Sequence, residues 1–188
     1  MDLRVVTTVA SVPARRAALT CAMRVAALAT WTAVAPGSVG AVLPAGAEPV
    51  RWPEAPLLAL DGQPLDAASG DWKCLYLDFW ASWCAPCRLS FPWMNEAHDR
   101  WGARGLRVLA VGLDRKTDDG RRFAVQAGAR FAVALDPQAQ WGRHFQVKAM
   151  PTSYLVHRTR GLLWKHEGFR TQDAATLSVQ LAQALELA

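Results

Sequence analysis

Apolar residues fall in several short runs, separated by segments in which they recur with a helical period. The runs cover residues 57–60, 73–80, 106–113 and 131–135. A strand covered on both faces has such a continuous run, because it exposes neither face to water. Residues 152–157 and 162–168 flank a turn at 158–161 and predict an antiparallel hairpin.

Helices are expected over residues 85–101, 118–127, 138–145 and 171–187. In the first of these, the residues near helical spacing are Leu89, Phe91, Met94, His98 and Trp101, around Pro92. In the last, the inward residues are Ala174, Leu177, Leu181 and Leu185. The alternation of strands and helices predicts an α/β domain, with a mostly parallel central sheet, an antiparallel edge and helices on both faces.

The first 47 residues do not fit this pattern. Asp2 is their only acid, and Arg4, Arg15, Arg16 and Arg24 precede an uncharged run over residues 25–47 that ends in Ala45-Gly46-Ala47. A charged start, an apolar stretch and a small-residue end are typical of a signal peptide, cleaved here after Ala47. A retained membrane anchor is the alternative, because the run is nearly long enough to cross a bilayer. Met23 is an alternative start of translation.

Either interpretation sends the rest of the chain across a membrane, since the arginines keep the segment before the run in the cytoplasm. We therefore expect a periplasmic or extracytoplasmic protein, with residues 48–56 as a tether and 57–188 as the folded domain. Without residues 1–47, 17 basic and 15 acidic residues remain, so the net charge falls from +5 to +2. This removes the main electrostatic support for a nucleic-acid partner. The three remaining cysteines are too few for a disulfide scaffold.

Two cysteines three residues apart follow the apolar run at 73–80, in Trp83-Cys84-Ala85-Pro86-Cys87. Cys84 is expected in the first turn of the next helix, where free backbone amides and the helix dipole favour a thiolate. Cys87 lies one turn further along, close enough to form a disulfide with Cys84 and more shielded from solvent. The spacing therefore predicts a redox pair in which Cys84 attacks and Cys87 resolves.

Other uses of two cysteines fit the sequence less well. A structural zinc site needs two more ligands, and the sequence has no second CxxC motif and no paired histidines. Haem attachment needs a histidine directly after the second cysteine, where Arg88 stands. An inert disulfide has no need of a helix start preceded by aromatic residues. We predict no metal site, and we interpret Cys74 as a small core residue.

This motif resembles the active site of the thioredoxin superfamily and, more narrowly, of the exported TlpA-like thiol:disulfide oxidoreductases. Pro92 falls where these proteins have a helix kink, and Met150-Pro151-Thr152 is similar to their cis-proline loop. The resemblance implies a thioredoxin-like fold over residues 57–188, with an extra βα insertion at 121–135. It also implies that Pro151 is cis and that Met150 and Pro151 bind the substrate peptide. Trp80 and Trp83 are expected to pack around the disulfide and shape a docking patch, with a place in the core as the alternative for Trp80.

Asp78 lies in the most apolar predicted strand, six residues before Cys84. A carboxyl group buried there should have a raised pKa and can exchange a proton with Cys87. The alternative is a half-buried Asp78 that hydrogen-bonds to the sheet and has no catalytic role. The resemblance implies a catalytic role through thioredoxin itself, which has a buried aspartate at this place, whereas TlpA-like sequences often have a neutral residue.

Together these features predict an exported protein-disulfide reductase that needs no cofactor, because its own thiols carry the electrons. The resemblance implies a membrane thiol-reductant transporter as electron donor, and client proteins with disulfides or with cysteines that receive haem or metal. Thr152 stands where the cytochrome c maturation branch usually has an acidic residue, which argues against that branch. Two alternatives stay open: a copper(I)-binding and delivery module that uses Cys84 and Cys87 as ligands, and an oxidase or isomerase of the same fold.

Overall fold

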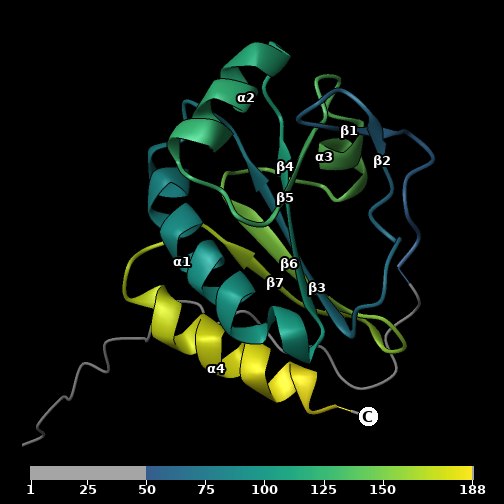
Figure 1. Cartoon of the computed structure of the whole chain (residues 1–188), viewed down its shortest axis with the longest axis vertical. Coiled ribbons are helices and arrows are strands. Elements are labelled where there is room, and N and C mark those ends of the chain that lie inside the picture. Colours follow the sequence, from purple (N-terminus) through teal and green to yellow (C-terminus); the bar gives the residue numbers. More distant parts are fainter. Residues whose placement is uncertain (1–49, 188) are drawn as a thin grey trace, which may run out of the picture. The chain divides into compact units, whose positions relative to one another are not determined.

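A computed structural model describes residues 50–187. They form a seven-stranded mixed sheet in the order β2-β1-β5-β4-β3-β6-β7 (Figure 1). The strands are β1 (Leu57–Ala59), β2 (Pro64–Leu65), β3 (Cys74–Trp80), β4 (Leu106–Gly112), β5 (Ala132–Leu135), β6 (Thr152–His157) and β7 (Gly161–Glu167). The helices are α1 (Ala85–Trp101), α2 (Thr117–Gln126), α3 (Gln140–His144) and α4 (Asp173–Leu185), and a short 3-10 helix spans Gly102–Arg104. The predicted α/β architecture is confirmed, but the prediction of a mostly parallel sheet with one antiparallel edge is wrong. Within residues 50–187, β3–β4 and β4–β5 pair in parallel, and the other four pairings are antiparallel, because β1–β2 and β6–β7 add antiparallel strands at both edges.

Strand β3 lies inside the sheet and carries the segment that leads to the two cysteines. It pairs in parallel with β4 and antiparallel with β6, and all seven of its residues are buried. Burial on both faces explains why its sequence is continuously apolar apart from Asp78. In this register Asp78 lies between Ala110 of β4 and Ser153 of β6.

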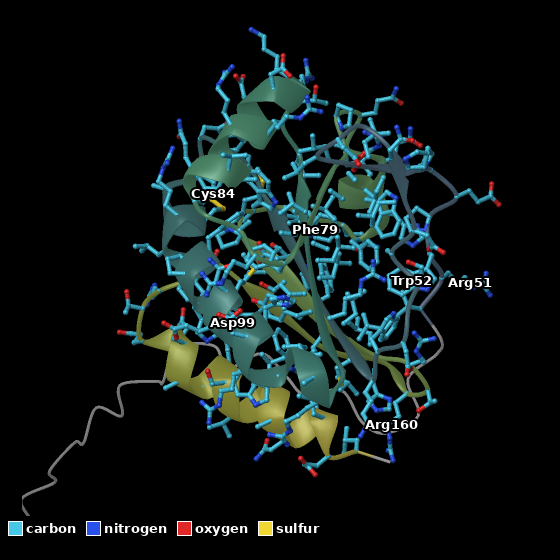
Figure 2. The ribbon with its side chains drawn as sticks, in the orientation of Figure 1. Arg51, Trp52, Phe79, Cys84, Asp99 and Arg160 are labelled. Carbon is cyan, nitrogen blue, oxygen red and sulfur yellow. A yellow bond between two sulfur atoms is a disulfide. The ribbon has the colours of Figure 1, made fainter. Side chains whose placement is uncertain are left out.

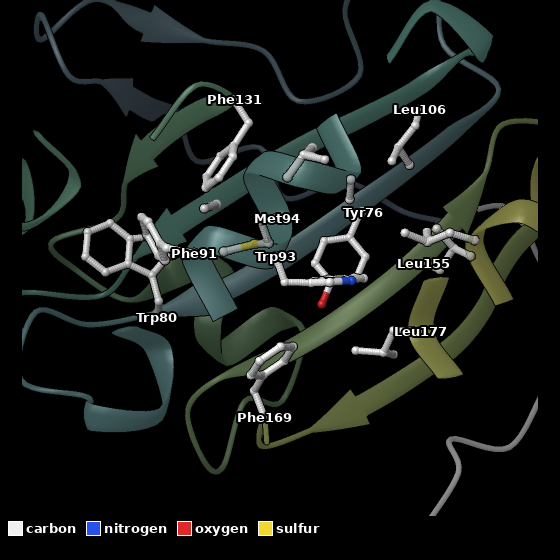
Figure 3. Packing of buried hydrophobic residues seen from close by; sticks show 14 of the residues in the cluster. Tyr76, Trp80, Phe91, Trp93, Met94, Leu106, Phe131, Leu155, Phe169 and Leu177 are labelled. Carbon is white, nitrogen blue, oxygen red and sulfur yellow. The ribbon is translucent and has the colours of Figure 1, made fainter. Parts of the chain in front are cut away.

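The helices cover the two faces of the sheet unequally. Residues of α1, α2 and α4 share one core with the side of β3 that carries Tyr76 and Trp80, and α3 contributes Trp141 to a second core on the opposite side. Figure 3 shows part of the first core, with Trp80 and Phe91 labelled. The Trp80 ring also stacks on Phe123, with the ring centroids 4.9 Å apart. The expected insertion is present as α2 and β5, and β5 adds a parallel strand beside β4.

Helix α1 has the predicted bounds, but Leu89, one of the residues near helical spacing, does not face the core. Leu89 is 54% exposed, whereas Phe91, Met94 and Trp101 are buried. Leu89 is two positions from Phe91, which places it on the opposite side of a helix with 3.6 residues per turn. In α4 the prediction is better: Leu177, Leu181 and Leu185 are buried, and Ala174 packs against the same core.

Residues 50–56, expected to be part of a tether, pack against α3 instead. The Trp52 ring lies 6.0 Å from Trp141 between centroids, and the indole nitrogen of Trp141 donates to the Ala55 carbonyl at 2.7 Å. Figure 2 labels Trp52 on this side of the protein. The cause is the apolar surface of Trp52, which is removed from water by the aromatic residues of the second core. The two-residue strand β2 was not predicted.

The predicted leader, residues 1–47, lies outside the described residues. Within residues 50–187, none of the helices has the length and apolar character needed to cross a membrane.

Candidate active site

The loop between β3 and α1 is fixed to the end of the neighbouring strand β4. The backbone N–H and the hydroxyl of Ser82 donate to the Asp114 carboxylate at 2.9 and 2.7 Å. The Leu113 N–H also donates to the Trp80 carbonyl at 2.9 Å. Sequence reasoning missed Asp114, although an acid that directly follows a buried parallel strand is expected at the same sheet edge as Ser82.

Cys84 occupies the N-cap position of α1, one residue before the first turn in which it was expected. Its backbone is extended, and its sulfur accepts the Cys87 backbone N–H at 3.3 Å. Pro86 stands at the start of the helix, where its missing N–H costs no helical hydrogen bond. The site therefore offers a backbone donor and the positive end of the helix dipole to a negative charge on the Cys84 sulfur.

Cys84 and Cys87 are joined by a disulfide with an S–S distance of 2.00 Å. Cys84 is 4% exposed and Cys87 fully buried, so the order of exposure agrees with the sequence, although the difference is small. Figure 2 labels Cys84 and shows the yellow sulfur atoms where α1 begins. Of the two residues, Cys84 is the one that retains some exposed surface.

Trp83 is 72% exposed directly before this disulfide, whereas Trp80 is fully buried. The neighbouring Arg88 lies with its guanidinium 4.8 Å from the centroid of the Phe123 ring and donates to the Ser82 carbonyl at 3.1 Å. These contacts link α1, α2 and the loop before the cysteines. An exposed tryptophan on such an anchored loop can contact another chain.

The loop before β6 contains the expected cis peptide bond, between Met150 and Pro151. Met150 packs against the core cluster that includes Cys84 and Cys87. The Thr152 hydroxyl donates to the Ala149 carbonyl at 2.7 Å, and the Pro151 carbonyl accepts the Gly168 N–H at 2.7 Å. The fold thus brings Met150, 66 residues after Cys84 in the sequence, to the core that contains the disulfide.

Asp78 is completely buried, as its position in β3 predicts. Its Oδ1 accepts the Ser153 hydroxyl at 2.8 Å, and Ser153 accepts the Tyr76 hydroxyl at 2.7 Å. Among the residues that the structure describes, its Oδ2 has no hydrogen-bond partner. Burial raises the pKa of Asp78 from its ordinary 3.8 to about 7, and the hydrogen bond from Ser153 acts in the opposite direction.

Sequence reasoning missed Tyr76 and Ser153. The signal for Tyr76 was its position two residues before Asp78, on the same face of the strand. The signal for Ser153 was a hydroxyl residue within a buried strand, where its side chain needs a partner. Neither signal identifies the partner, because that depends on the register between β3 and β6.

The third cysteine of the domain has no place in this site. Cys74 is buried, and burial raises the pKa of its thiol to about 12, so it carries no thiolate near neutrality. Across residues 50–187, no group of three or more His, Cys, Asp or Glu side chains is arranged to hold a metal ion.

The sequence of this chain is similar to those of known proteins. The AhpC/TSA family matches residues 51–164, a segment that holds both cysteines and the cis-proline. The thiol-disulfide oxidoreductase ResA of Bacillus thuringiensis subsp. konkukian is 26% identical over 114 residues, which cover 61% of this chain and 66% of ResA. The chain thus spans just under two thirds of the length of this relative.

Solved structures agree with the match. A Chlorobium tepidum crystal structure, described as a candidate thiol:disulfide interchange protein DsbE, is 44% identical with a TM-score of 0.66, over 76% of this chain and 99% of that one. A secreted Mycobacterium tuberculosis disulfide oxidoreductase is 17% identical with a TM-score of 0.61, over 69% and 96% of the two chains, and shows the fold alone. The family match, covering more than half of the chain, and the 44% identical structure show that this chain belongs to the AhpC/TSA family of the thioredoxin superfamily.

Proposed function

We propose that this protein is an exported thiol:disulfide oxidoreductase that reduces disulfides in client proteins through Cys84 and Cys87. The observation that carries the proposal is the place of Cys84 at the N-cap of α1, where its sulfur accepts the Cys87 N–H. A thiolate there is stabilised by that donor and by the helix dipole, and is therefore nucleophilic near neutrality. The names of the relatives, which are thiol-disulfide oxidoreductases and interchange proteins, agree with this chemistry.

The reaction balances as two thiol–disulfide exchanges. The Cys84 thiolate attacks one sulfur of a client disulfide, and the other client sulfur leaves as a thiolate and takes a proton. Cys87 then loses its proton and attacks Cys84, which releases the second client thiolate and leaves the Cys84–Cys87 disulfide. The client gains two electrons and the enzyme loses them. We assign Asp78 as the group that receives the Cys87 proton, because both are fully buried and Asp78 shares a strand face with Tyr76 and Trp80 of the same core.

The client is held, in this proposal, by Trp83 and by the loop of Met150 and Pro151. Trp83 supplies exposed apolar surface, and Met150 lies against the core that contains the disulfide. An extended client segment pairs with the backbone of this loop, which presents its cysteine to Cys84.

The reductive direction, export by the N-terminal segment and recharging by a membrane thiol-reductant transporter are parts of the same proposal. They rest on the leader pattern of residues 1–47 and on the need for a reductase to be re-reduced in an oxidising compartment. Clients would be proteins with disulfides, or with cysteines that must be reduced before haem or metal is inserted.

The test is the reduction of insulin disulfides, followed by turbidity, with two single variants. Cys84→Ser should abolish the reaction, because it removes the attacking sulfur. Cys87→Ser should retain the first exchange and accumulate mixed disulfides that mass spectrometry detects. Cys74→Ala is the matched control, and it should reduce insulin as the parent does, since the buried Cys74 carries no thiolate.

Two outcomes would contradict the proposal. If Cys87 is alkylated before Cys84 in the reduced protein, the roles of the two cysteines are reversed. If the reduced protein binds copper(I) stoichiometrically and leaves insulin intact, the copper delivery alternative replaces the reductase.

A further inference from the structure

A chain of three side chains crosses from β3 to β6 beneath the disulfide-bearing helix. Tyr76 and Asp78 lie on the same face of β3, and Ser153 stands opposite Asp78 in the antiparallel register. The hydroxyl oxygens of Tyr76 and Ser153 are 2.7 Å apart, and the Ser153 hydroxyl is 2.8 Å from Asp78 Oδ1. All three residues are at most 2% exposed, so no bulk water competes for these bonds.

The chemistry of the groups fixes the direction of this chain when Asp78 is ionised. A carboxylate only accepts hydrogen bonds, so Ser153 must donate its single hydroxyl proton to Oδ1. The Ser153 oxygen is then left as an acceptor, and it receives the Tyr76 proton. The Tyr76 ring is held edge-on to Trp93 at 5.3 Å and to Trp164 at 5.9 Å between centroids. Figure 3 shows Tyr76 beside Trp93 in this packing.

We propose that Ser153 and Tyr76 are positioning residues for Asp78: their hydroxyl chain keeps Oδ1 as an acceptor and leaves Oδ2 as the oxygen that takes up and releases the proton. Oδ2 is buried and, within residues 50–187, has no hydrogen-bond partner. The chain stabilises the carboxylate, and burial favours the neutral acid. The two effects oppose each other at Asp78, and the resulting pKa is about 7.

Other ionisable groups face the same core and have to be separated from Asp78 in any pH experiment. Cys74 lies on β3, His157 on β6, and Cys84 and Cys87 at the start of α1. His166 of β7 stands opposite Ser153, and its Nε2 is 3.7 Å from a carboxylate oxygen of Asp173, the first residue of α4. Among the described residues, the side chains of Ser153 and Tyr76 are the ones that form the hydrogen-bond chain of Asp78.

The proposal predicts how the titration of Asp78 responds to each hydroxyl. Ser153→Ala removes the bond to the charged form, so the midpoint should rise by about one pH unit, the size of a single hydrogen bond to an ionised group. Tyr76→Phe leaves the Ser153–Asp78 hydrogen bond but removes the one that Tyr76 donates to Ser153, so the Asp78 midpoint should rise by less than in Ser153→Ala. Ser153→Thr keeps a hydroxyl at this position and should restore the parent midpoint.

The measurement is the carbon-13 chemical shift of the Asp78 side-chain carboxyl between pH 5 and 9, in the full-length disulfide form. Tyr154→Phe is the matched control, because it removes a buried tyrosine hydroxyl that donates to the Phe145 carbonyl, in the core on the other face of the sheet. His166→Asn is the second control, because it removes the histidine that stands opposite Ser153. Neither control should move the Asp78 midpoint.

An unchanged midpoint in Ser153→Ala would overturn the proposal, as would a shift in Tyr154→Phe equal to that in Tyr76→Phe. Tyr76→Phe deletes one oxygen and carries the test if Ser153→Ala does not fold. A second readout, the pH dependence of mixed-disulfide release, rests on the proposed function. If the carboxyl midpoint moves and the kinetic inflection does not, the hydroxyl chain is supported and the role of Asp78 in resolution is contradicted.

Discussion

Two buried aspartates show how differently this fold uses the same side chain. Asp136, 4% exposed, follows β5 and accepts the backbone N–H groups of Gln140 and Trp141 at 3.0 and 2.8 Å, with a longer bond from Gly142 at 3.3 Å. Asp78 lies within β3, and one serine hydroxyl is the only hydrogen-bond donor to it among the described residues. Both oxygens of Asp136 are engaged, whereas one oxygen of Asp78 is open.

The difference follows from the place of each residue in the fold. Asp136 stands at a strand end, where the first turn of α3 presents unpaired N–H groups. Asp78 stands in the middle of a ladder, where the backbone N–H groups are already used by β4 and β6. The carboxylate at the helix start therefore has donors for both of its oxygens, and the carboxylate inside the sheet has a donor for one.

The sharpest test of this comparison is the stability of Asp78→Asn against pH. The folded pKa of about 7 lies above the ordinary 3.8, so between these values the folded protein holds a proton that the unfolded chain has released. The stability of the parent therefore falls as the pH rises from about 4 to about 7. Three pH units correspond to an upper bound of about 4 kcal/mol.

Asparagine does not titrate, so Asp78→Asn should match the parent near pH 4 and exceed it by up to about 4 kcal/mol above pH 7. Urea unfolding of the disulfide form at pH 4, 5.5, 7 and 8 measures the difference. A constant difference across this range would show that Asp78 does not titrate within it.

The opposite result is expected at the other aspartate. Asp136→Ala leaves the N–H groups of Gln140 and Trp141 without their acceptor, and should lower the free energy of unfolding by about 2–3 kcal/mol. Asp136→Asn keeps one acceptor oxygen and should lose less. The same urea experiment at pH 7 gives both values. A gain in stability from Asp136→Ala would remove the contrast with Asp78.

For catalysis we expect the opposite: replacing Asp78 should impair the reaction, and replacing Asp136 should leave it unchanged. If Asp78 accepts the Cys87 proton, as we propose, Asp78→Asn should slow release of the mixed disulfide about tenfold, which corresponds to about 1.4 kcal/mol of barrier. Stopped-flow measurement between pH 6 and 9 checks it, with Asp136→Asn as the variant that keeps the parent rate. If Asp78→Asn has the same rate and pH profile as the parent protein, Asp78 has a structural role alone.

Much of the fold could be predicted because burial leaves a direct record in the sequence. The runs at 73–80 and 106–113 are strands covered on both faces, and the bounds of α1 follow from its period and from Trp101. The predictions failed where a pattern is too short or its partner lies elsewhere. Strand β2 has two residues, and Trp52 becomes part of a core only through the distant Trp141.

The candidate site shows the same contrast between local features, which the sequence predicts, and contacts between distant residues, which it does not. The two cysteines and Pro151 could be identified because the motif is local and the resemblance is specific. The hydrogen bonds that set their surroundings join residues far apart in sequence, such as Ser82 with Asp114 and Ser153 with Asp78. These contacts depend on strand register, and a single sequence does not give that register to within one residue.

Replacing a third buried carboxylate, Asp114, should have the smallest effect on stability. Asp114 contacts the loop before Cys84 through Ser82. It is 5% exposed, and each of its oxygens accepts one donor of Ser82. In Asp114→Asn the remaining oxygen can keep the Ser82 N–H, and the serine hydroxyl can rotate to accept from the new amide. The loss should therefore be about 1 kcal/mol, the net value of one ordinary hydrogen bond. Urea unfolding at pH 7 measures it, and Ser82→Ala, which deletes one donor and retains the backbone bond, is the control. A loss as large as that of Asp136→Ala would mean that the loop before Cys84 depends on the charge of Asp114 and not on the number of its hydrogen bonds.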